Sequence, residues 1–388
     1  MKKGKILFIL DDFYPIKGAP AIRIKSFIRK LSDYDLSVLG GSSAAVKKRN
    51  YHYPHRPSER NIFAFSYFLL KMNLTALSMA KKNKYKAIIL SIPKYELLFI
   101  FPFLKKFSKV LILDVRDSID FIDYVSYFKH FLPSFLADFC GNLVKIIICH
   151  AFKRSIRNAS HITVANEGIL NSLKSYVPSP VLNTKITLVA NGVDINQFQP
   201  KDKRWYDGSS PLNLAYIGNF AEKDKFDWLY QTLITFKGKL ILSLVGEGRN
   251  KTKIISKLKE LDIQFKDYGS VEHDQIPAIL NKIDLGFIFR EKDVTASIPV
   301  AIFEFVSMNI PTITNGVGIM ADFVKHNELG VVISSSDEFR GFIKRVIAEP
   351  KILQRYNHLH SIAEKEYSRE AQAELFRKII DSHLKHGQ

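Results

Sequence analysis

Cysteine is scarce in this sequence, with 2 residues among 388. Cys140 and Cys149 have neither the spacing of a metal-binding motif nor that of a redox motif. This argues against a disulfide-stabilised secreted fold and against a cysteine-ligated metal. Two such cysteines are typical of a protein in a reducing cytosol.

Long uncharged apolar runs are also missing. No such run approaches the roughly 18 residues of a membrane-spanning helix, so we expect that the chain does not cross a membrane. The first apolar segment, residues 6–10, is followed at once by Asp11 and Asp12. It therefore indicates a first β-strand and not a signal peptide.

Acidic residues are too few to balance the basic ones, and one half of the chain accounts for the shortage. Residues 1–200 contain 30 Lys and Arg against 13 Asp and Glu, a net charge of +17, whereas residues 201–388 contain 27 against 25. The basic half predicts an anionic partner. Nucleic acid, anionic lipid and a phosphorylated acceptor are the candidates.

Aromatic segments flanked by lysines favour a membrane surface among these candidates. They are residues 62–70, 95–104 and 121–135, and they are followed by a helical face that carries His150, Lys153, Arg154 and Arg157 within residues 141–157. The alternative is that the aromatics form the core and the lysines a solvated rim. We expect no nucleic-acid binding, because no recognisable module for it is present.

Strand-like and helix-like segments alternate along the whole chain, which predicts a doubly wound α/β architecture. A chain of 388 residues is longer than a single domain with one hydrophobic core usually is, so two Rossmann-like domains are expected. A charged, turn-rich segment at 200–211 marks the break. The predicted parts are an N-terminal domain (1–199), a C-terminal domain (200–366) and a last helix (367–388) that packs back on the first domain.

The most informative segment is 285–318. A strand at 285–289 is followed by a polar loop, a helix that begins at Pro299 and carries Glu304, and a strand at 312–314. Ligands bind at the carboxyl ends of strands in such sheets, and free N–H groups at the helix start suit a diphosphate. Glu304 could accept hydrogen bonds from a sugar's hydroxyl pair. The alternative is an ordinary α/β unit with a solvated glutamate.

Other strand ends supply further candidates. Gly18 opens a helix that contains Arg23, and residues 110–123 end a buried strand in carboxylates around Arg116, which could steer a phosphate, and Asp117, which could orient a hydroxyl. An Asp–Arg pair that merely fixes this loop is the alternative. Turns in the second half of the chain and just before it add Asn191, Gly218, Asn219, Lys223, Lys225, Gly246 and Glu247.

Taken in order, these pieces resemble the retaining glycosyltransferases of family 4, which have the GT-B fold of two Rossmann-like domains facing across a cleft. The matching pieces are LILDVRD, LVANGVDINQFQP, AYIGNF, LVGEG and IPVAIFEFVSMNIPTITNGVG, which span nearly the whole chain. The LILDVRD form is similar to the subgroup that builds bacterial surface polysaccharides. The resemblance implies sugar transfer from a nucleotide donor to a carbohydrate or lipid-linked acceptor, with retention and without a metal.

Four positions depart from the family pattern. Ala296 stands where many members carry a first glutamate, so Glu304 alone is left to hold the ribose. Asn219 replaces an arginine and Ala301 a lysine, so Arg290, Lys223 or Lys225 would have to neutralise the diphosphate. Asp117 replaces a histidine near the reacting sugar.

The resulting assignment is a cytoplasmic hexosyltransferase-like enzyme on the inner face of the plasma membrane, which binds a nucleotide-diphosphate sugar and a polyprenyl-diphosphate-linked or glycan acceptor. Asp117, Lys223 and Glu304 are assigned to catalysis, and no cofactor or metal is expected. The donor residues are Gly18, Asn191, Gly218, Asn219, Lys225, Gly246, Glu247, Arg290, Ser297, Ile298 and Pro299; the acceptor and membrane residues are Arg23, Arg116, Lys153, Arg154 and Arg157.

Two alternatives share this fold. One is a catalytically degenerate scaffold or binding subunit of a glycan-assembly complex, which the missing cations favour. The other is a sugar-nucleotide epimerase, for which no acid–base set can be placed. The sequence does not specify the donor sugar, its base, the acceptor, the linkage or the oligomeric state.

Overall fold

The computed structural model describes residues 2–14, 18–42, 51–52, 54–57, 62–121, 123–129, 131–177, 185–201, 204–221, 224, 226–290, 297–316 and 318–386. The chain divides into two compact units. Unit 1 comprises Met1–Asn191 and Glu370–Gln388, and unit 2 comprises Gly192–Arg369.

Unit 1 is built on a parallel sheet of seven strands in the order β3-β2-β1-β4-β5-β6-β7. β4 and β5 are buried along their whole length, as continuous apolar runs in a covered parallel sheet should be. The strands are β1 (Lys5–Tyr14), β2 (Asp35–Ser42), β3 (Tyr51–His52), β4 (Ala87–Ile92), β5 (Val110–Val115), β6 (His161–Val164) and β7 (Ile186–Leu188).

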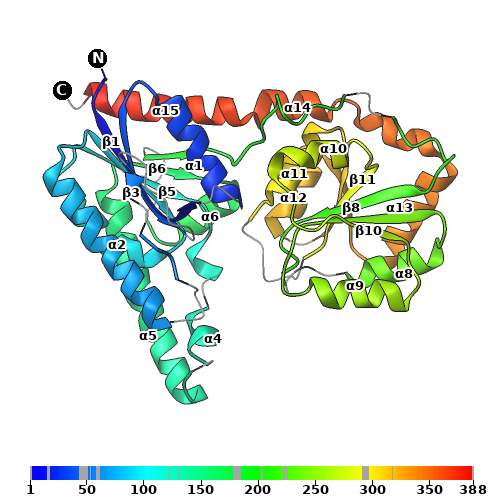
Figure 1. The fold of residues 1–388 in the computed structure, drawn as a ribbon, viewed down its shortest axis with the longest axis horizontal. Coiled ribbons are helices and arrows are strands. Elements are labelled where there is room, and N and C mark those ends of the chain that lie inside the picture. Colours follow the sequence, from blue (N-terminus) through cyan, green and yellow to red (C-terminus); the bar gives the residue numbers. More distant parts are fainter. Residues whose placement is uncertain are drawn as a thin grey trace. The chain divides into compact units, whose positions relative to one another are not determined.

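Helices cover both faces of this sheet (Figure 1). On one face, α1 (Gly18–Lys30) and α15 (Arg369–His386) pack on alternate side chains of β1, and the rings of Phe27 and Phe376 stack 4.0 Å apart. The other face carries α2 (Ile62–Lys82), η1 (Tyr95–Phe99), α3 (Phe101–Leu104), α5 (Ser134–Asn158) and α6 (Glu167–Lys174). The short η2 (Ile119–Phe121) and α4 (Tyr124–Lys129) precede α5.

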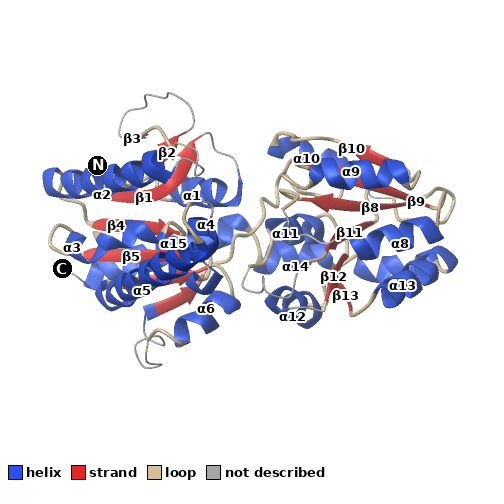
Figure 2. Ribbon diagram, turned by 90° about the horizontal axis from the view of Figure 1, so that it is seen from below, coloured by secondary structure: helices blue, strands red, loops and turns tan. Residues whose placement is uncertain are grey.

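Unit 2 has a parallel sheet of six strands in the order β10-β9-β8-β11-β12-β13. They are β8 (Leu212–Ile217), β9 (Leu240–Val245), β10 (Phe265–Asp267), β11 (Leu285–Ile288), β12 (Thr312–Asn315) and β13 (Gly330–Ile333). Figure 2 shows the helices on both sides of each sheet. The architecture therefore confirms the predicted pair of doubly wound α/β domains.

Two buried clusters mark the faces of the second sheet. One contains α8 (Asp227–Thr235), α9 (Lys251–Glu260) and α13 (Ser336–Ala348). The other contains α10 (Ile276–Leu280), α11 (Val300–Ser307), α12 (Gly318–His326) and α14 (Leu359–Glu366). Two short 3₁₀ helices, η3 (His273–Gln275) and η4 (Pro350–Tyr356), complete the unit.

The units divide between Asn191 and Gly192, earlier than the predicted break at 199/200. The reason is that Val193 and Phe198 are fully buried in the core of unit 2. Val193 also exchanges backbone hydrogen bonds with the segment before α15, donating to the Tyr367 carbonyl and accepting from the Arg369 amide. The turn-rich segment 200–211 therefore lies inside unit 2.

One helix bears on the expectation that the chain does not cross a membrane. α5 is long and apolar enough to cross a membrane by length and composition, although the charged residues Asp138 and Lys145 interrupt it. Length and composition alone do not place a helix in a membrane, because core helices of soluble proteins pass the same test.

Candidate functional site

The end of β11 and the start of α11 form the predicted donor junction in unit 2. Pro299 caps α11 in an extended conformation, and Ile298 and Ala301 are buried against the same core. Arg290 is held at the strand end by Asn315, which accepts from the Arg290 amide at 2.9 Å and donates to the Arg290 carbonyl at 2.7 Å. The backbone that leads into the junction is thus fixed.

Glu304 lies on the second turn of α11, and its side chain is only 5% exposed. Its Oε1 atom is 2.9 Å from Nε2 of His273, which lies in η3. The His273 backbone carbonyl accepts a hydrogen bond from Gln197, and its ring lies 5.1 Å from the ring of Phe198. The carboxylate predicted to hold a ribose is therefore oriented by a histidine that is itself held in place.

Sequence reasoning missed His273. Its partner Glu304 is 31 residues further along the chain. No spacing rule connects the two, so only the folded structure reveals the pair.

Arg290 is the cation predicted to replace a missing phosphate-binding residue, and in the structure it faces a carboxylate. Its Nη1 donates to Ser297 Oγ at 2.9 Å, while its Nε lies 3.6 Å from Asp224 Oδ1. The other oxygen of Asp224 accepts from the Tyr216 hydroxyl at 2.7 Å and from the Ala221 amide at 2.9 Å. Burial, together with the charge of Asp224, raises the pKa of Tyr216 far above its usual value, so Tyr216 stays a donor.

The glycines at the ends of β8 and β9 are required by close backbone contact. A Cβ on Gly246, whose φ is +119°, would lie 2.0 Å from the Gly218 carbonyl oxygen. A Cβ on Gly248 would lie 1.5 Å from the carbonyl oxygen of Asn219, whose own side chain is exposed. The two turns therefore pack against each other. This packing by itself requires glycine at positions 246 and 248, so contact with a ligand is not needed to explain the two glycines.

Glu247, also predicted to bind the donor, is engaged by a buried lysine. Lys251 Nζ lies 2.8 Å from Glu247 Oε1 and 2.7 Å from Asp267 Oδ1. Burial acts to lower the pKa of Lys251, but the hydrogen bonds that its ammonium donates to Asp267 and Glu247 outweigh burial and raise the pKa. Glu247 is 60% exposed, so it can still meet solvent or a ligand on its free side.

In unit 1, Arg23 forms a buried ion pair. Its side chain is 1% exposed, and its Nη2 is 2.9 Å from Oδ1 of the fully buried Asp114, while its Nη1 donates to the Ala190 carbonyl at 2.7 Å. Burial alone would raise the pKa of Asp114, but the charge and hydrogen bonds of Arg23 lower it. Arg23 therefore lies inside the unit, and its position does not support the predicted contact with acceptor or membrane.

A second arginine, Arg116, follows β5 at the strand-end edge of the same sheet. Its side chain is 5% exposed, and the Nε atom has no hydrogen-bond partner. Asp11 of β1 is a carboxylate close to it, with 3.8 Å between Arg116 Nη2 and Asp11 Oδ1, and Arg56 Nη2 is 3.5 Å from the other Asp11 oxygen. Two guanidinium groups therefore contact one buried carboxylate.

The other sites predicted in unit 1 are less enclosed. Asp117 is exposed, and its backbone carbonyl accepts from the Tyr95 hydroxyl at 2.6 Å. Lys153, Arg154 and Arg157 are exposed on the last turns of α5, with the guanidinium of Arg154 5.1 Å from the centre of the Phe103 ring.

Several predicted residues contribute backbone positions only or are not described. Gly18 begins α1, and Asn191 is the last residue of the first segment of unit 1. Lys223, Lys225 and position 296 lie outside the described residues. Within the described part of the chain, no group of three or more His, Cys, Asp or Glu side chains is arranged to hold a metal ion.

Comparison with known proteins agrees with this geometry. Residues 211–349, which contain the β11–α11 junction, match the family model described as "Glycosyl transferases group 1". The solved structure of sucrose-phosphate synthase from Thermosynechococcus elongatus is similar, with a TM-score of 0.73, 14% identity and coverage of 98% of this chain and 100% of that one. HepE of Anabaena in complex with UDP has a TM-score of 0.71, 14% identity and coverage of 97% and 100%.

The chain has the GT-B fold. Among curated proteins, N-acetyl-alpha-D-glucosaminyl L-malate synthase of Bacillus anthracis is 20% identical over 254 residues, which are 59% of this chain. The chain spans 65% of the length of that relative. The family match and the structural likenesses together support a GT-B glycosyltransferase.

Proposed function

We propose that the protein is a retaining glycosyltransferase that moves a hexose from a nucleoside-diphosphate sugar to a lipid-linked or polysaccharide acceptor. It would act in the synthesis of a bacterial capsule, an O-antigen or another cell-surface glycan, peripherally on the cytoplasmic face of the membrane. The observation that carries the proposal is the buried Glu304 at the start of α11, oriented by His273 at 2.9 Å.

The donor side rests on unit 2. A carboxylate held on the second turn of α11 can accept both hydroxyl hydrogens of a ribose, and the N–H groups at the helix start suit a diphosphate. The UDP bound by HepE, a protein of the same fold, is consistent with this assignment.

The acceptor side rests on unit 1. Arg116 follows β5 and lies near Asp11 of β1, and a phosphate of a lipid-linked acceptor would supply a partner for its Nε atom, which has none in the structure. The names of two similar proteins indicate anionic groups in their products, L-malate in one case and a phosphorylated sugar in the other.

The reaction needs positioning more than covalent participation. The acceptor hydroxyl oxygen bonds to the anomeric carbon on the face that the diphosphate leaves, the bond from that carbon to the phosphate oxygen breaks, and the acceptor proton passes to the departing phosphate. Cations beside the phosphate stabilise the charge that develops there. This chemistry needs no nucleophilic side chain.

Calorimetric titration with uridine, guanosine and adenosine diphosphates tests the donor site. One of them should bind the wild type, and Glu304→Gln should weaken that binding by about tenfold or more, because a hydrogen bond to a charged group contributes about 1.5–3 kcal/mol. Glu364→Gln, the same change at an exposed glutamate of α14, should bind like the wild type. Equal affinity in the Glu304 and Glu364 variants would contradict the assignment.

A scaffold without catalysis is the second candidate. The Arg290–Asp224 contact favours it because a carboxylate competes with the donor phosphate for Arg290, while Lys223 and Lys225 lie outside the described residues. Mass spectrometry of reactions with a panel of sugar nucleotides separates the two. Transfer to a lipid-linked acceptor supports the enzyme. Nucleotide binding supports the scaffold if neither sugar transfer nor donor hydrolysis occurs with any member of the panel.

A further inference from the structure

The outer face of α5 carries an unusual row of exposed side chains. Phe135 is 71% exposed, Phe139 66% and Ile146 66%, and the neighbouring Leu136, Leu143 and Ile147 are between 39% and 46% exposed. Steps of three and four residues place them on one side of the helix. Soluble surfaces rarely leave so many large apolar side chains together without a partner.

The same face changes character along the helix. Its last turns present His150, Lys153, Arg154 and Arg157, all of them exposed. The outer face of α5 is therefore apolar over the first half of the helix and basic over the second half.

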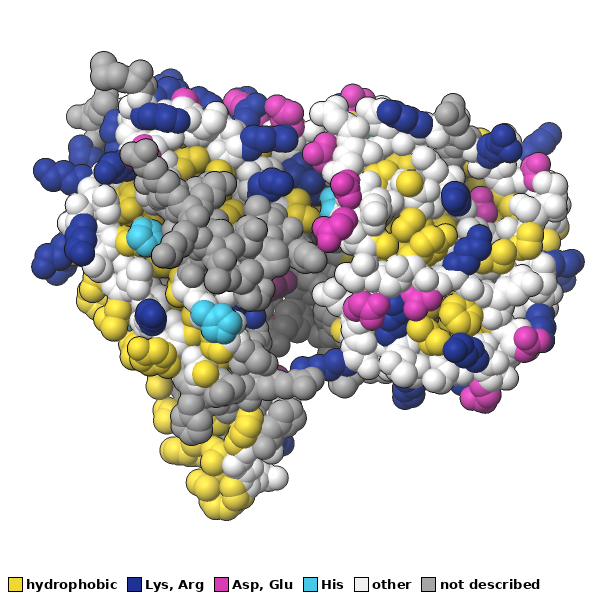
Figure 3. Space-filling view, viewed as in Figure 1, with side chains coloured by type: hydrophobic (Ala, Val, Ile, Leu, Met, Phe, Trp, Pro, Cys, Tyr) yellow, Lys and Arg dark blue, Asp and Glu magenta, His cyan; other side chains and the backbone are white. Residues whose placement is uncertain are grey.

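The inner side of α5 packs against the rest of unit 1, so the fold fixes which residues its outer face exposes. Gly141 is buried where α4 crosses, and a Cβ there would lie 2.7 Å from Val125. Further along, Ile148, Phe152 and Ile156 enter the core under the first sheet. Figure 1 shows α4 and the first half of α5 as a hairpin that extends beyond the sheet, and in Figure 3 apolar side chains gather at its end.

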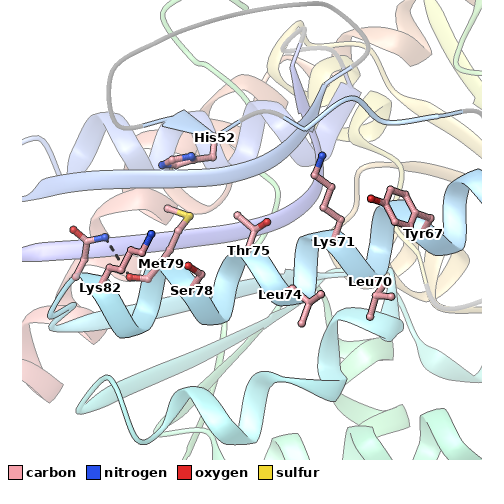
Figure 4. Close-up of a pocket in the computed structure, with 10 residues that line it drawn as sticks. His52, Tyr67, Leu70, Lys71, Leu74, Thr75, Ser78, Met79 and Lys82 are labelled. Carbon is pink, nitrogen blue, oxygen red and sulfur yellow. Dashed lines mark hydrogen bonds between the residues drawn. The ribbon is translucent and has the colours of Figure 1, made fainter.

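α2 prolongs the apolar surface on the same face of the sheet. Tyr67, Leu70 and Leu74 are 55–66% exposed and line a shallow groove of about 440 Å³ together with Lys71. In Figure 4 these side chains point outward from α2. η1 lies between α2 and α5 and contacts both, so the two helices belong to one surface.

We propose that the hairpin of α4 and α5 inserts into the interface of an anionic bilayer. Phe131 and the apolar half of α5 would enter the acyl boundary, while Lys153, Arg154 and Arg157 stay at the phosphate groups. A lipid surface fits because it offers an apolar layer beside an anionic one, as the two halves of the helix require. The excess of 30 basic over 13 acidic residues in the first 200 adds attraction at longer range.

This inference rests on the membrane contact of the proposed function and specifies that the contact is made by insertion of apolar side chains. Purely electrostatic docking would rely on the cations of α5, whereas insertion makes its phenylalanines the anchor. Lipid binding is measured apart from nucleotide binding, so failure of this proposal and failure of the donor assignment are distinguishable.

Sedimentation with vesicles of phosphatidylcholine and phosphatidylglycerol tests insertion. The double variant Phe135→Ser/Phe139→Ser should bind at least about tenfold more weakly than the wild type, which should stay bound at about 0.5 M salt, where charge attraction is screened. Ile234→Ser, which changes an exposed apolar residue of unit 2, is the control and should bind normally. Thermal unfolding and nucleotide affinity should be the same in all three proteins.

Fluorescence quenching of a tryptophan measures independently whether the apolar half of α5 enters the bilayer. Tryptophan placed at position 139 (Phe139→Trp) should be quenched by brominated lipids, whereas tryptophan at position 234 (Ile234→Trp) should not. Normal vesicle binding by the serine double variant, or complete release of the wild type by salt, would overturn insertion. So would a change from dimer to monomer in that variant without loss of lipid binding, because the face would then be a contact between copies of the chain.

Discussion

The buried pair of Arg23 and Asp114 permits the sharpest test of Arg23, which the sequence assigned to acceptor or membrane binding. Arg23→Met keeps a side chain of similar length and removes the charge and all donors. In the structure this deletes the contacts of 2.9 and 3.4 Å to Asp114 and the 2.7 Å hydrogen bond to the Ala190 carbonyl. Asp114 keeps only the hydroxyl donors of Ser91 and Thr163.

The expected cost is large because Asp114 has no access to solvent. Removing one partner of a buried ion pair leaves an uncompensated charge and typically costs about 3–5 kcal/mol. For a domain the size of unit 1, each kcal/mol lowers the melting temperature by about 2–4 °C, so a decrease of about 6–20 °C is expected.

Thermal unfolding followed by circular dichroism measures this loss. Arg29→Met, the same substitution on the exposed side of α1, should melt within about 2 °C of the wild type, which corresponds to the small effect of most surface changes. Arg23→Met/Asp114→Leu should recover much of the loss, because an apolar pair needs no compensation. A melting temperature unchanged in Arg23→Met, combined with weaker lipid or acceptor binding, would refute the structural role and restore the surface assignment.

Three further predictions concern the site and the stability of unit 1. His273→Ala should raise the KM for the donor by about tenfold, because Glu304 loses its orienting partner. His273→Gln, which can still donate a hydrogen bond, should restore much of the affinity. A KM unchanged in both variants would exclude a positioning role. Arg116→Gln should raise the KM for an anionic acceptor and leave nucleotide affinity unchanged in calorimetry, with the opposite pattern counting against an acceptor role. Burial lowers the pKa of His161 to about 4, so between pH 6.5 and 4 the unfolded chain binds a proton at this histidine more readily than the folded chain does. The free energy of unfolding should therefore fall as the pH drops from about 6.5 towards 4. Urea titrations at each pH measure this decline, and His161→Gln should flatten it.

The sequence predicted the sheets well because their strands carry strong local signals. The strands predicted at 285–289 and 312–314 are β11 (Leu285–Ile288) and β12 (Thr312–Asn315), each within one residue of its predicted bounds. β3 was missed because a strand of two residues has no pattern of its own. The break between the units was placed too late because the burial of Val193 and Phe198 depends on contacts made far along the chain.

Side-chain roles were harder to predict than strands. The aromatic segments illustrate the difficulty, since both interpretations of them hold in part. Half of 95–104 is core, including Tyr95 and Phe101, whereas Phe131 and Phe135 are among the exposed large apolar residues. The aromatic fraction is the same in the two segments, 4 of 10 and 6 of 15 residues, and only the position of each residue relative to the sheet separates them.

The cations of the predicted site show the same limit. Net charge counts Arg23 and Lys153 alike, but the first is buried against Asp114 and the second is exposed on α5. Asp114 lies 91 residues from Arg23 in sequence. Such pairs are visible only after folding, so charge counts predict the kind of partner a unit attracts and not the residues that bind it.

The contact between Arg290 and Asp224 bears on whether the donor junction can work. Asp224 Oδ2 already accepts two hydrogen bonds, from Tyr216 and Ala221, that do not involve the arginine. The 3.6 Å from Arg290 Nε to Asp224 Oδ1 is longer than a hydrogen bond. Asp224 Oδ1 has no hydrogen-bond partner of its own, so turning the guanidinium towards Ser297 and a phosphate at the start of α11 would leave Oδ2 as the bonded oxygen of the carboxylate. The contact therefore keeps a cation beside the junction, and an asparagine at position 219 does not by itself imply lost activity.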